Sequence, residues 1–260
     1  MNIQKNLIRC GALLAAVLAL APSALAADAE TASVPAVQLI PAVRTVQTDW
    51  RLLLVNPWNT VPEGYKIQLA TLSNGLQVDE RIYDDLDDML TDCREAGLSP
   101  IVCSAYRTEA TQTRLYRNKV ARVRASGVPE DQVEAEAARW VAKPGTSEHQ
   151  TGLALDIVAA SYQILDERQE DTAEQKWLME NSWKYGFILR YPSEKSDITG
   201  IGYEPWHYRY VGKAAAAEIY RTGVCLEEYL GRAVLPAAEL TPARPARAAE
   251  APAVPPRGPG

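Results

Sequence analysis

Apolar side chains recur along the middle of the chain with two different periods, which predicts a mixture of helices and strands. Between residues 78 and 96 they are spaced three and four apart, as on one face of a helix. Short apolar runs bounded by turn residues predict strands at 52–55, 100–105, 153–158 and 187–190, and an extended segment at 203–211. Further helices are expected at 108–126, 129–142, 173–185 and 213–222. Because helices and strands do not alternate regularly, an α+β fold is favoured over a doubly wound sheet.

The two ends of the chain differ in composition from this middle part. Lys5 and Arg9 precede an apolar run, and Ala24-Leu25-Ala26 fits a cleavage site, so 1–26 is predicted to be a secretory signal peptide. Residues 27–49 are expected to form a flexible linker. Residues 236–260 contain 7 Pro and 8 Ala, which predicts a disordered tail. One folded domain at 50–235 remains, in a protein expected to be secreted to the extracellular cell envelope; it would contact a membrane only if the signal segment stayed uncleaved.

Composition and charge restrict the partners of this domain. Hydrophobic residues make up 47% of the chain and charged residues 23%, as in an ordinary globular protein. The net charge of −6 argues against a nucleic-acid partner, because phosphate binding needs a basic face. We expect a monomer. A disulfide between Cys93 and Cys103 is plausible across the turn at Gly97, and two buried free thiols are the alternative.

Candidate chemistry centres on the only two histidines, His149 and His207, each of which has an acid within seven residues. Two imidazoles and one carboxylate form a catalytic zinc site when a fourth position stays open for water. Asp156 and Glu204 are the neighbouring acids. Two isolated histidines are, however, also compatible with purely structural roles.

Three motifs then point to one family. They are Ser147-x-His149-x-x-Gly152-x-Ala154-x-Asp156, Glu204-x-x-His207, and Ser104-Ala105-Tyr106-Arg107 with Gln112 five residues further on. Together, and in this order, they resemble the zinc D-alanyl-D-alanine carboxypeptidases of the VanY type. The resemblance covers about residues 50–229. It implies the hedgehog/DD-peptidase fold, which has a mixed sheet with packed helices and zinc in a cleft.

The resemblance also implies a role for each matched residue. His149, Asp156 and His207 correspond to the zinc ligands, Glu204 to the catalytic carboxylate, and Arg107 to the arginine that stabilises the oxyanion. Gln112 and Ser147 correspond to residues lining the substrate pocket. From the residues alone, Arg107 is also compatible with an ordinary salt bridge, Gln112 with an exposed helix face, and Ser147 with a hydroxyl bonded to its own backbone.

The implied activity is hydrolysis of the last peptide bond of a peptidoglycan stem pentapeptide ending in D-Ala-D-Ala, which releases the terminal D-alanine. A D,D-dipeptidase and a peptidoglycan endopeptidase are the enzymatic alternatives, and a catalytically silent wall-binding module is the other. The signal peptide disfavours the dipeptidase, because free dipeptide is a cytoplasmic substrate. The presence of both Glu204 and Arg107 argues against the silent module, since a binding protein needs no general base.

Overall fold

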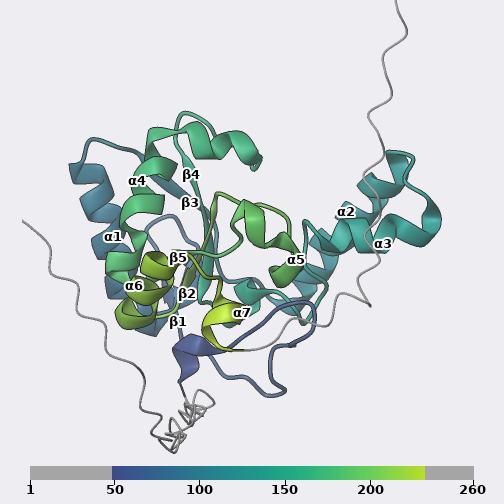
Figure 1. Ribbon diagram of the computed structural model, residues 1–260, viewed down its shortest axis with the longest axis horizontal. Helices are drawn as coiled ribbons and strands as arrows, with labels where there is room; N and C mark the ends of the chain where they lie inside the picture. Colours follow the sequence, from purple (N-terminus) through teal and green to yellow (C-terminus); the bar gives the residue numbers. More distant parts are fainter. Residues whose placement is uncertain (1–48, 232–260) are drawn as a thin grey trace, which may run out of the picture. The chain divides into compact units, whose positions relative to one another are not determined.

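A four-stranded antiparallel sheet organises the protein (Figure 1). The computed structural model describes residues 49–231, so the expected signal peptide, nearly all of the linker and the Pro/Ala-rich tail lie outside the described residues. The sheet has the order β3-β4-β6-β5, formed by β3 (Pro100–Ser104), β4 (Ala154–Ala159), β6 (His207–Tyr210) and β5 (Phe187–Leu189). A separate hairpin joins β1 (Leu69–Thr71) to β2 (Gln77–Asp79). The α+β class is confirmed, but the strand pairings are all antiparallel and the sheet is not mixed.

Alternation along the central strands divides their side chains between two faces. Leu155 and Ile157 of β4 and Tyr208 of β6 belong to the main apolar core. This core includes residues of α1 (Tyr83–Glu95) and α4 (Ala173–Asn181), which lie side by side in Figure 1. Because successive side chains of a strand point to opposite faces, Asp156 and His207 point away from this core. The polar site is therefore formed on the opposite face of the sheet.

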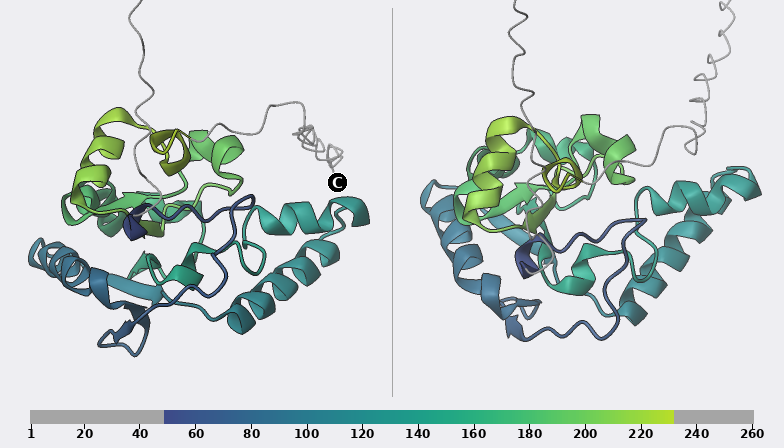
Figure 2. Two further views of the ribbon diagram at one scale, coloured as in Figure 1. Left: turned by 90° about the horizontal axis from the view of Figure 1, so that it is seen from below. Right: turned by 60° about the horizontal axis from the view of Figure 1, so that its bottom comes forward.

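The remaining helices pack at the edges of this arrangement. A second apolar cluster joins Ile188 of β5 to α6 (Lys213–Thr222) and α7 (Leu226–Tyr229). α2 (Glu109–Ala125) and α3 (Glu130–Ala138) form a hairpin with its own small cluster, which extends away from the sheet in both views of Figure 2. Short α5 (Ser196–Thr199) lies in the connection between β5 and β6. None of the helices between residues 49 and 231 is long and apolar enough to cross a membrane.

Three local expectations are corrected by the structure. Residues 78–82 are not the start of a helix: Val78 pairs with Ala70 in the β1–β2 hairpin, and the Asp79 side chain then caps a 3-10 turn at Glu80–Ile82. The segment 52–55 is not a strand either. The carbonyl oxygens of Arg51 and Leu53 accept hydrogen bonds from the Arg209 side chain, so these two groups are satisfied without a strand partner.

The expected Cys93–Cys103 disulfide is the third correction, because the cysteines of the described part are all free. Cys93 is fully buried in α1, on the helix face that packs against the sheet. Val102 of β3 belongs to that same core, whereas Cys103 lies at an irregularity of the strand between Val102 and Ser104 and is exposed. The alternative of two buried thiols is therefore met only by Cys93.

Candidate metal centre and active site

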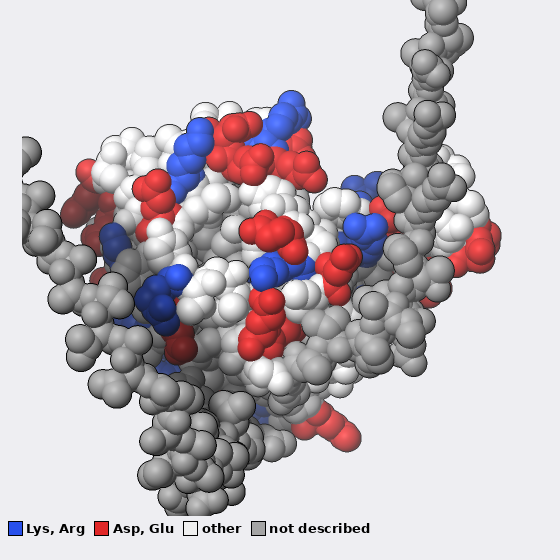
Figure 3. All heavy atoms as spheres, in the orientation of Figure 1, with Lys and Arg blue, Asp and Glu red and all other residues white. Residues whose placement is uncertain are grey.

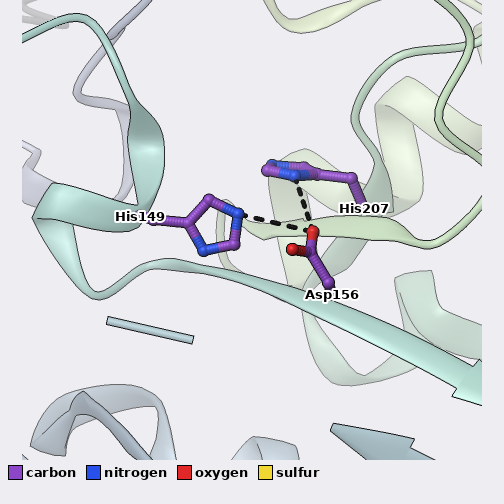
Figure 4. A group of neighbouring side chains, drawn as sticks. All are labelled: His149, Asp156 and His207. Carbon is purple, nitrogen blue, oxygen red and sulfur yellow. Dashed lines mark hydrogen bonds and ion pairs between the residues drawn. The ribbon is translucent and has the colours of Figure 1, made fainter. Parts of the chain in front are cut away.

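His149 is presented by a short 3-10 helix, Glu148–Thr151, which ends at Gly152. Gly152 has φ +70°, and a Cβ at this position would lie 2.8 Å from the backbone nitrogen of Asp79. Only glycine therefore fits where this turn packs against β2. The ring of His149 is fixed by a 2.7 Å contact between its Nδ1 and the Ala105 carbonyl oxygen, which leaves Nε2 directed at Asp156 (Figure 4).

Asp156 and His207 are direct partners across the two central strands, β4 and β6. His207 Nδ1 lies 3.1 Å from Asp156 Oδ1, and His149 Nε2 lies 3.4 Å from the same oxygen. The sequence resemblance placed these three residues at one site, and the structure brings them together (Figure 4). All three side chains are buried, and one ligand atom from each lies within 4.8 Å of the other two.

These three residues fit a zinc ion. Two imidazole nitrogens and one carboxylate oxygen are the donor set of a catalytic zinc site with one open position. Burial and the charge of Arg107 lower the pKa of His149 to about 4, so its ring is neutral and able to ligate. Burial would by itself lower the pKa of His207, but the carboxylates of Asp156 and Glu148 raise it to about 9. The carboxylates beside His207 thus favour positive charge at its ring, and metal binding would release the proton that His207 holds.

Glu204 lies beside this cluster without belonging to it. It is 7% exposed and precedes β6 in a turn where the His207 amide donates to the Glu204 carbonyl oxygen. Its Oε2 is 3.6 Å from His207 Nδ1, but it is not among the three converging ligands. Burial is the main cause that raises the pKa of Glu204 to about 8. A carboxyl group that titrates near neutral pH is suited to exchange a proton during catalysis.

Arg107 connects the cluster to the expected pocket residues. Its Nη2 donates to Asp156 Oδ2 at 2.7 Å and its Nε to Ser104 Oγ at 2.9 Å. Its Nη1 lies 3.5 Å from Gln112 Oε1. The salt bridge considered as an alternative is thus present, and it holds the guanidinium at the metal site. Gln112 is buried rather than exposed, and its amide donates to the Ala142 carbonyl oxygen at 2.7 Å.

Ser147, the other expected pocket residue, is buried at the start of the 3-10 helix that carries His149. Its side chain makes no capping hydrogen bond to that helix. A surface pocket of about 420 Å³ includes Trp206, which directly precedes His207 in the chain. Its other lining residues are Trp140, Leu165, Asp166, Glu167 and Arg168. On the face drawn in Figure 3, basic and acidic side chains are interspersed.

Sequence reasoning missed a buried charged network behind the histidines. It consists of Glu148, Arg190, Arg209 and Glu227, all of them buried. Glu148 Oε1 accepts from Arg190 Nε at 2.8 Å and from Arg209 Nη1 at 2.7 Å, and Arg190 also pairs with Glu227. One signal was available: Arg209 follows His207 by two residues in a strand, which places both side chains on the same face.

Comparisons with known proteins agree with this geometry. The VanY family of D-alanyl-D-alanine carboxypeptidases matches residues 75–213. A D-alanyl-D-alanine carboxypeptidase of Enterococcus faecalis is 48% identical over 184 residues, which cover 71% of this chain and 67% of that protein.

Solved structures extend the similarity to the fold. A vancomycin resistance D,D-pentapeptidase VanY, determined in complex with Zn(II), is 48% identical and has a TM-score of 0.65; the match covers 70% of this chain and 99% of that one. VanYB in complex with D-alanine-D-alanine is also 48% identical, with a TM-score of 0.65 over 71% of this chain and 99% of that one. The order of the motifs, the antiparallel sheet and the buried cluster on its polar face thus have a common explanation: this chain belongs to the VanY family of D-alanyl-D-alanine carboxypeptidases.

Proposed function

We propose that this protein is a zinc-dependent D-alanyl-D-alanine carboxypeptidase that removes the terminal D-alanine from peptidoglycan stem pentapeptides. The observation that carries the proposal is the convergence of His149, Asp156 and His207 beside a buried carboxylate that is not one of the ligands. The relatives at 48% identity support the activity, since one carries that enzyme name and another was solved with D-alanine-D-alanine.

The chain's own residues divide the work as follows. His149, Asp156 and His207 would hold the metal, which when bound supplies Lewis-acid chemistry and lowers the pKa of a water molecule to roughly 7. Glu204 accepts a proton from the attacking water at Oε2 and gives it to the leaving amine. Arg107 offers a cation at the same place, where developing negative charge on the scissile carbonyl oxygen is stabilised. No serine nucleophile is involved.

Two groups of alternatives are less well supported. A wall-binding module without activity needs neither a general base nor an arginine, yet Glu204 and Arg107 both lie at the cluster. A D,D-dipeptidase acts on free dipeptide, a cytoplasmic compound, whereas residues 1–26 have the pattern of a secretory signal. We therefore place the mature enzyme outside the cytoplasm, in the cell envelope, where it meets polymeric or precursor peptidoglycan.

Mass spectrometry of a digested muropeptide pentapeptide tests the proposal. We expect loss of one D-alanine, no loss in the presence of a zinc chelator, and recovery when zinc is restored. A β-lactam should leave the rate unchanged, because no serine is acylated. The same protein incubated with free D-alanyl-D-alanine and with a cross-linked dimer gives the comparison. Faster cleavage of the free dipeptide, or of the cross-link, would replace the carboxypeptidase by the corresponding alternative.

A further inference from the structure

Glu148 occupies the position between Ser147 and His149, which the family motif leaves open. Its side chain is fully buried, and its two carboxylate oxygens have different surroundings. Oε1 accepts hydrogen bonds from Arg190 Nε at 2.8 Å and Arg209 Nη1 at 2.7 Å. Oε2 lies 3.5 Å from His207 Nε2. Glu148 therefore joins two buried arginines to the ring of a proposed metal ligand.

The two atoms that face each other across this 3.5 Å gap share a property. Among the described residues, Glu148 Oε2 and His207 Nε2 are both buried and both without a hydrogen-bond partner. A buried polar atom left unpaired costs about 1–3 kcal/mol, so a small ring movement of about 0.5 Å that forms this bond is favoured. The gap is too narrow for a water molecule between the two atoms.

The carboxylate cannot easily turn elsewhere. Arg209 is held by the carbonyl oxygens of Arg51 and Leu53 through Nη2, at 3.1 and 2.7 Å. Arg190 is held by a bidentate pair with Glu227, at 2.9 and 2.7 Å. The two arginines and two glutamates sum to zero charge, so the network is neutral. Glu148 thus meets His207 with a fixed orientation.

A ligating histidine commonly donates its second ring N–H to a carboxylate or carbonyl oxygen, which sets the tautomer and the ring orientation. His149 has such a partner in the Ala105 carbonyl oxygen, through Nδ1. His207 faces Asp156 through Nδ1, so its second nitrogen is Nε2, and the acceptor available there is Glu148. The two histidines would therefore use opposite ring nitrogens toward the metal.

We propose that Glu148 is a positioning residue for the metal site: it accepts the Nε2 proton of His207, so that the Nδ1 lone pair faces Asp156 and the metal. The proposal rests on the zinc site of the proposed function but not on the reaction. Loss of Glu148 would loosen the ring of His207 and weaken metal binding. Changes to outer partners of this kind typically lower metal affinity by about 10- to 100-fold.

The first test is NMR of the zinc-loaded wild-type protein with ¹⁵N-labelled histidine, since the chain contains only two histidines. We expect one ring protonated at Nδ1 and the other at Nε2, with the Nε2 proton of His207 protected from exchange with water. Two rings protonated at the same nitrogen would overturn the proposal. This measurement needs no variant and does not depend on D-alanine release. Its result can therefore be interpreted even if the protein does not catalyse the proposed reaction.

The second test compares Glu148→Gln with Glu227→Gln by competition with a chromogenic zinc chelator. Both variants remove one buried negative charge from Arg190, but Glu227 pairs with Arg190 and Asn56 and not with a histidine. We expect Glu148→Gln to weaken zinc binding by about 10- to 100-fold and Glu227→Gln by less than threefold. Equal zinc affinities in the two variants would overturn the positioning role and leave Glu148 as a structural charge. If Glu148→Gln does not fold, the wild-type NMR measurement decides.

Discussion

Exchanging Glu204 for glutamine is expected to separate metal binding from proton transfer. Glutamine has nearly the same size and still forms hydrogen bonds, so the 7% exposed site can accommodate it without a cavity. Asp156 Oδ1 lies 3.4 Å from His149 and 3.1 Å from His207, whereas Glu204 approaches only His207, at 3.6 Å. Glu204→Gln should therefore retain the metal, because the three converging donors are untouched.

The expected loss of activity follows from the proposed role of Glu204 as general base. General base catalysis typically contributes 10²- to 10⁴-fold, which corresponds to about 3–5 kcal/mol at about 1.4 kcal/mol per decade. Burial raises the pKa of Glu204 to about 8, so the wild-type carboxyl group can take up and release a proton near neutral pH. The glutamine amide does not titrate and cannot replace this step. D-Alanine release from a pentapeptide should fall by that factor.

The assay combines D-alanine release, zinc content and melting temperature for Glu204→Gln and for Asp156→Asn. The second variant replaces a ligating carboxylate by a neutral amide, so it should lose zinc as well as activity. If Glu204→Gln loses the metal while Asp156→Asn keeps it, the two roles are exchanged. Full activity of zinc-loaded Glu204→Gln would refute water activation by this carboxylate.

Three further outcomes are expected. His207→Ala should reduce zinc from about one per chain to a small fraction by metal analysis, and near-normal zinc would exclude the site as drawn. A reducing agent should leave the melting temperature unchanged, because Cys93 and Cys103 are free; a fall of several degrees would contradict this. Burial by itself would raise the pKa of Glu227, but Arg190 lowers it below its ordinary value. Its ionised form thus stabilises the fold fully above about pH 4.3, and this stabilisation is lost as the pH falls through the lower, folded pKa. Urea unfolding at pH 7 and pH 3 measures the decrease in the free energy of unfolding, and that decrease should be smaller in Glu227→Gln.

Local signals were sufficient for most elements and insufficient where a long-range partner decides the structure. α2 was predictable because Thr108 caps it and Gly127 follows it, and the Thr108 hydroxyl indeed accepts from the Thr111 amide. Val78 and Ile82 are four residues apart, a spacing that fits one face of a helix, although Val78 lies in a strand. Pairing with Leu69–Thr71 decides between helix and strand, and no residue within 78–82 encodes that pairing.

In the candidate site, too, some residues could be predicted from local sequence signals and others depend on long-range partners. The three ligands were indicated because the chain has only two histidines, each near an acid, and because the motif spacing resembled a known family. The pairing of Glu148 with Arg209 joins residues 61 positions apart, and that of Glu148 with Arg190 joins residues 42 apart. Such a network depends on which strands become neighbours, so its members look like ordinary surface charges in the sequence.

The pairing of Asp156 with His207 has a consequence for how members of this family can diverge in length. These two residues are direct neighbours in the sheet although 51 positions separate them in the chain. A shift of one residue in the pairing of β4 with β6 would turn one ligand to the apolar face. Natural insertions and deletions should therefore accumulate around the helices between residues 160 and 186, while β5 (Phe187–Leu189) and the strands at 154–159 and 207–210 keep a constant length.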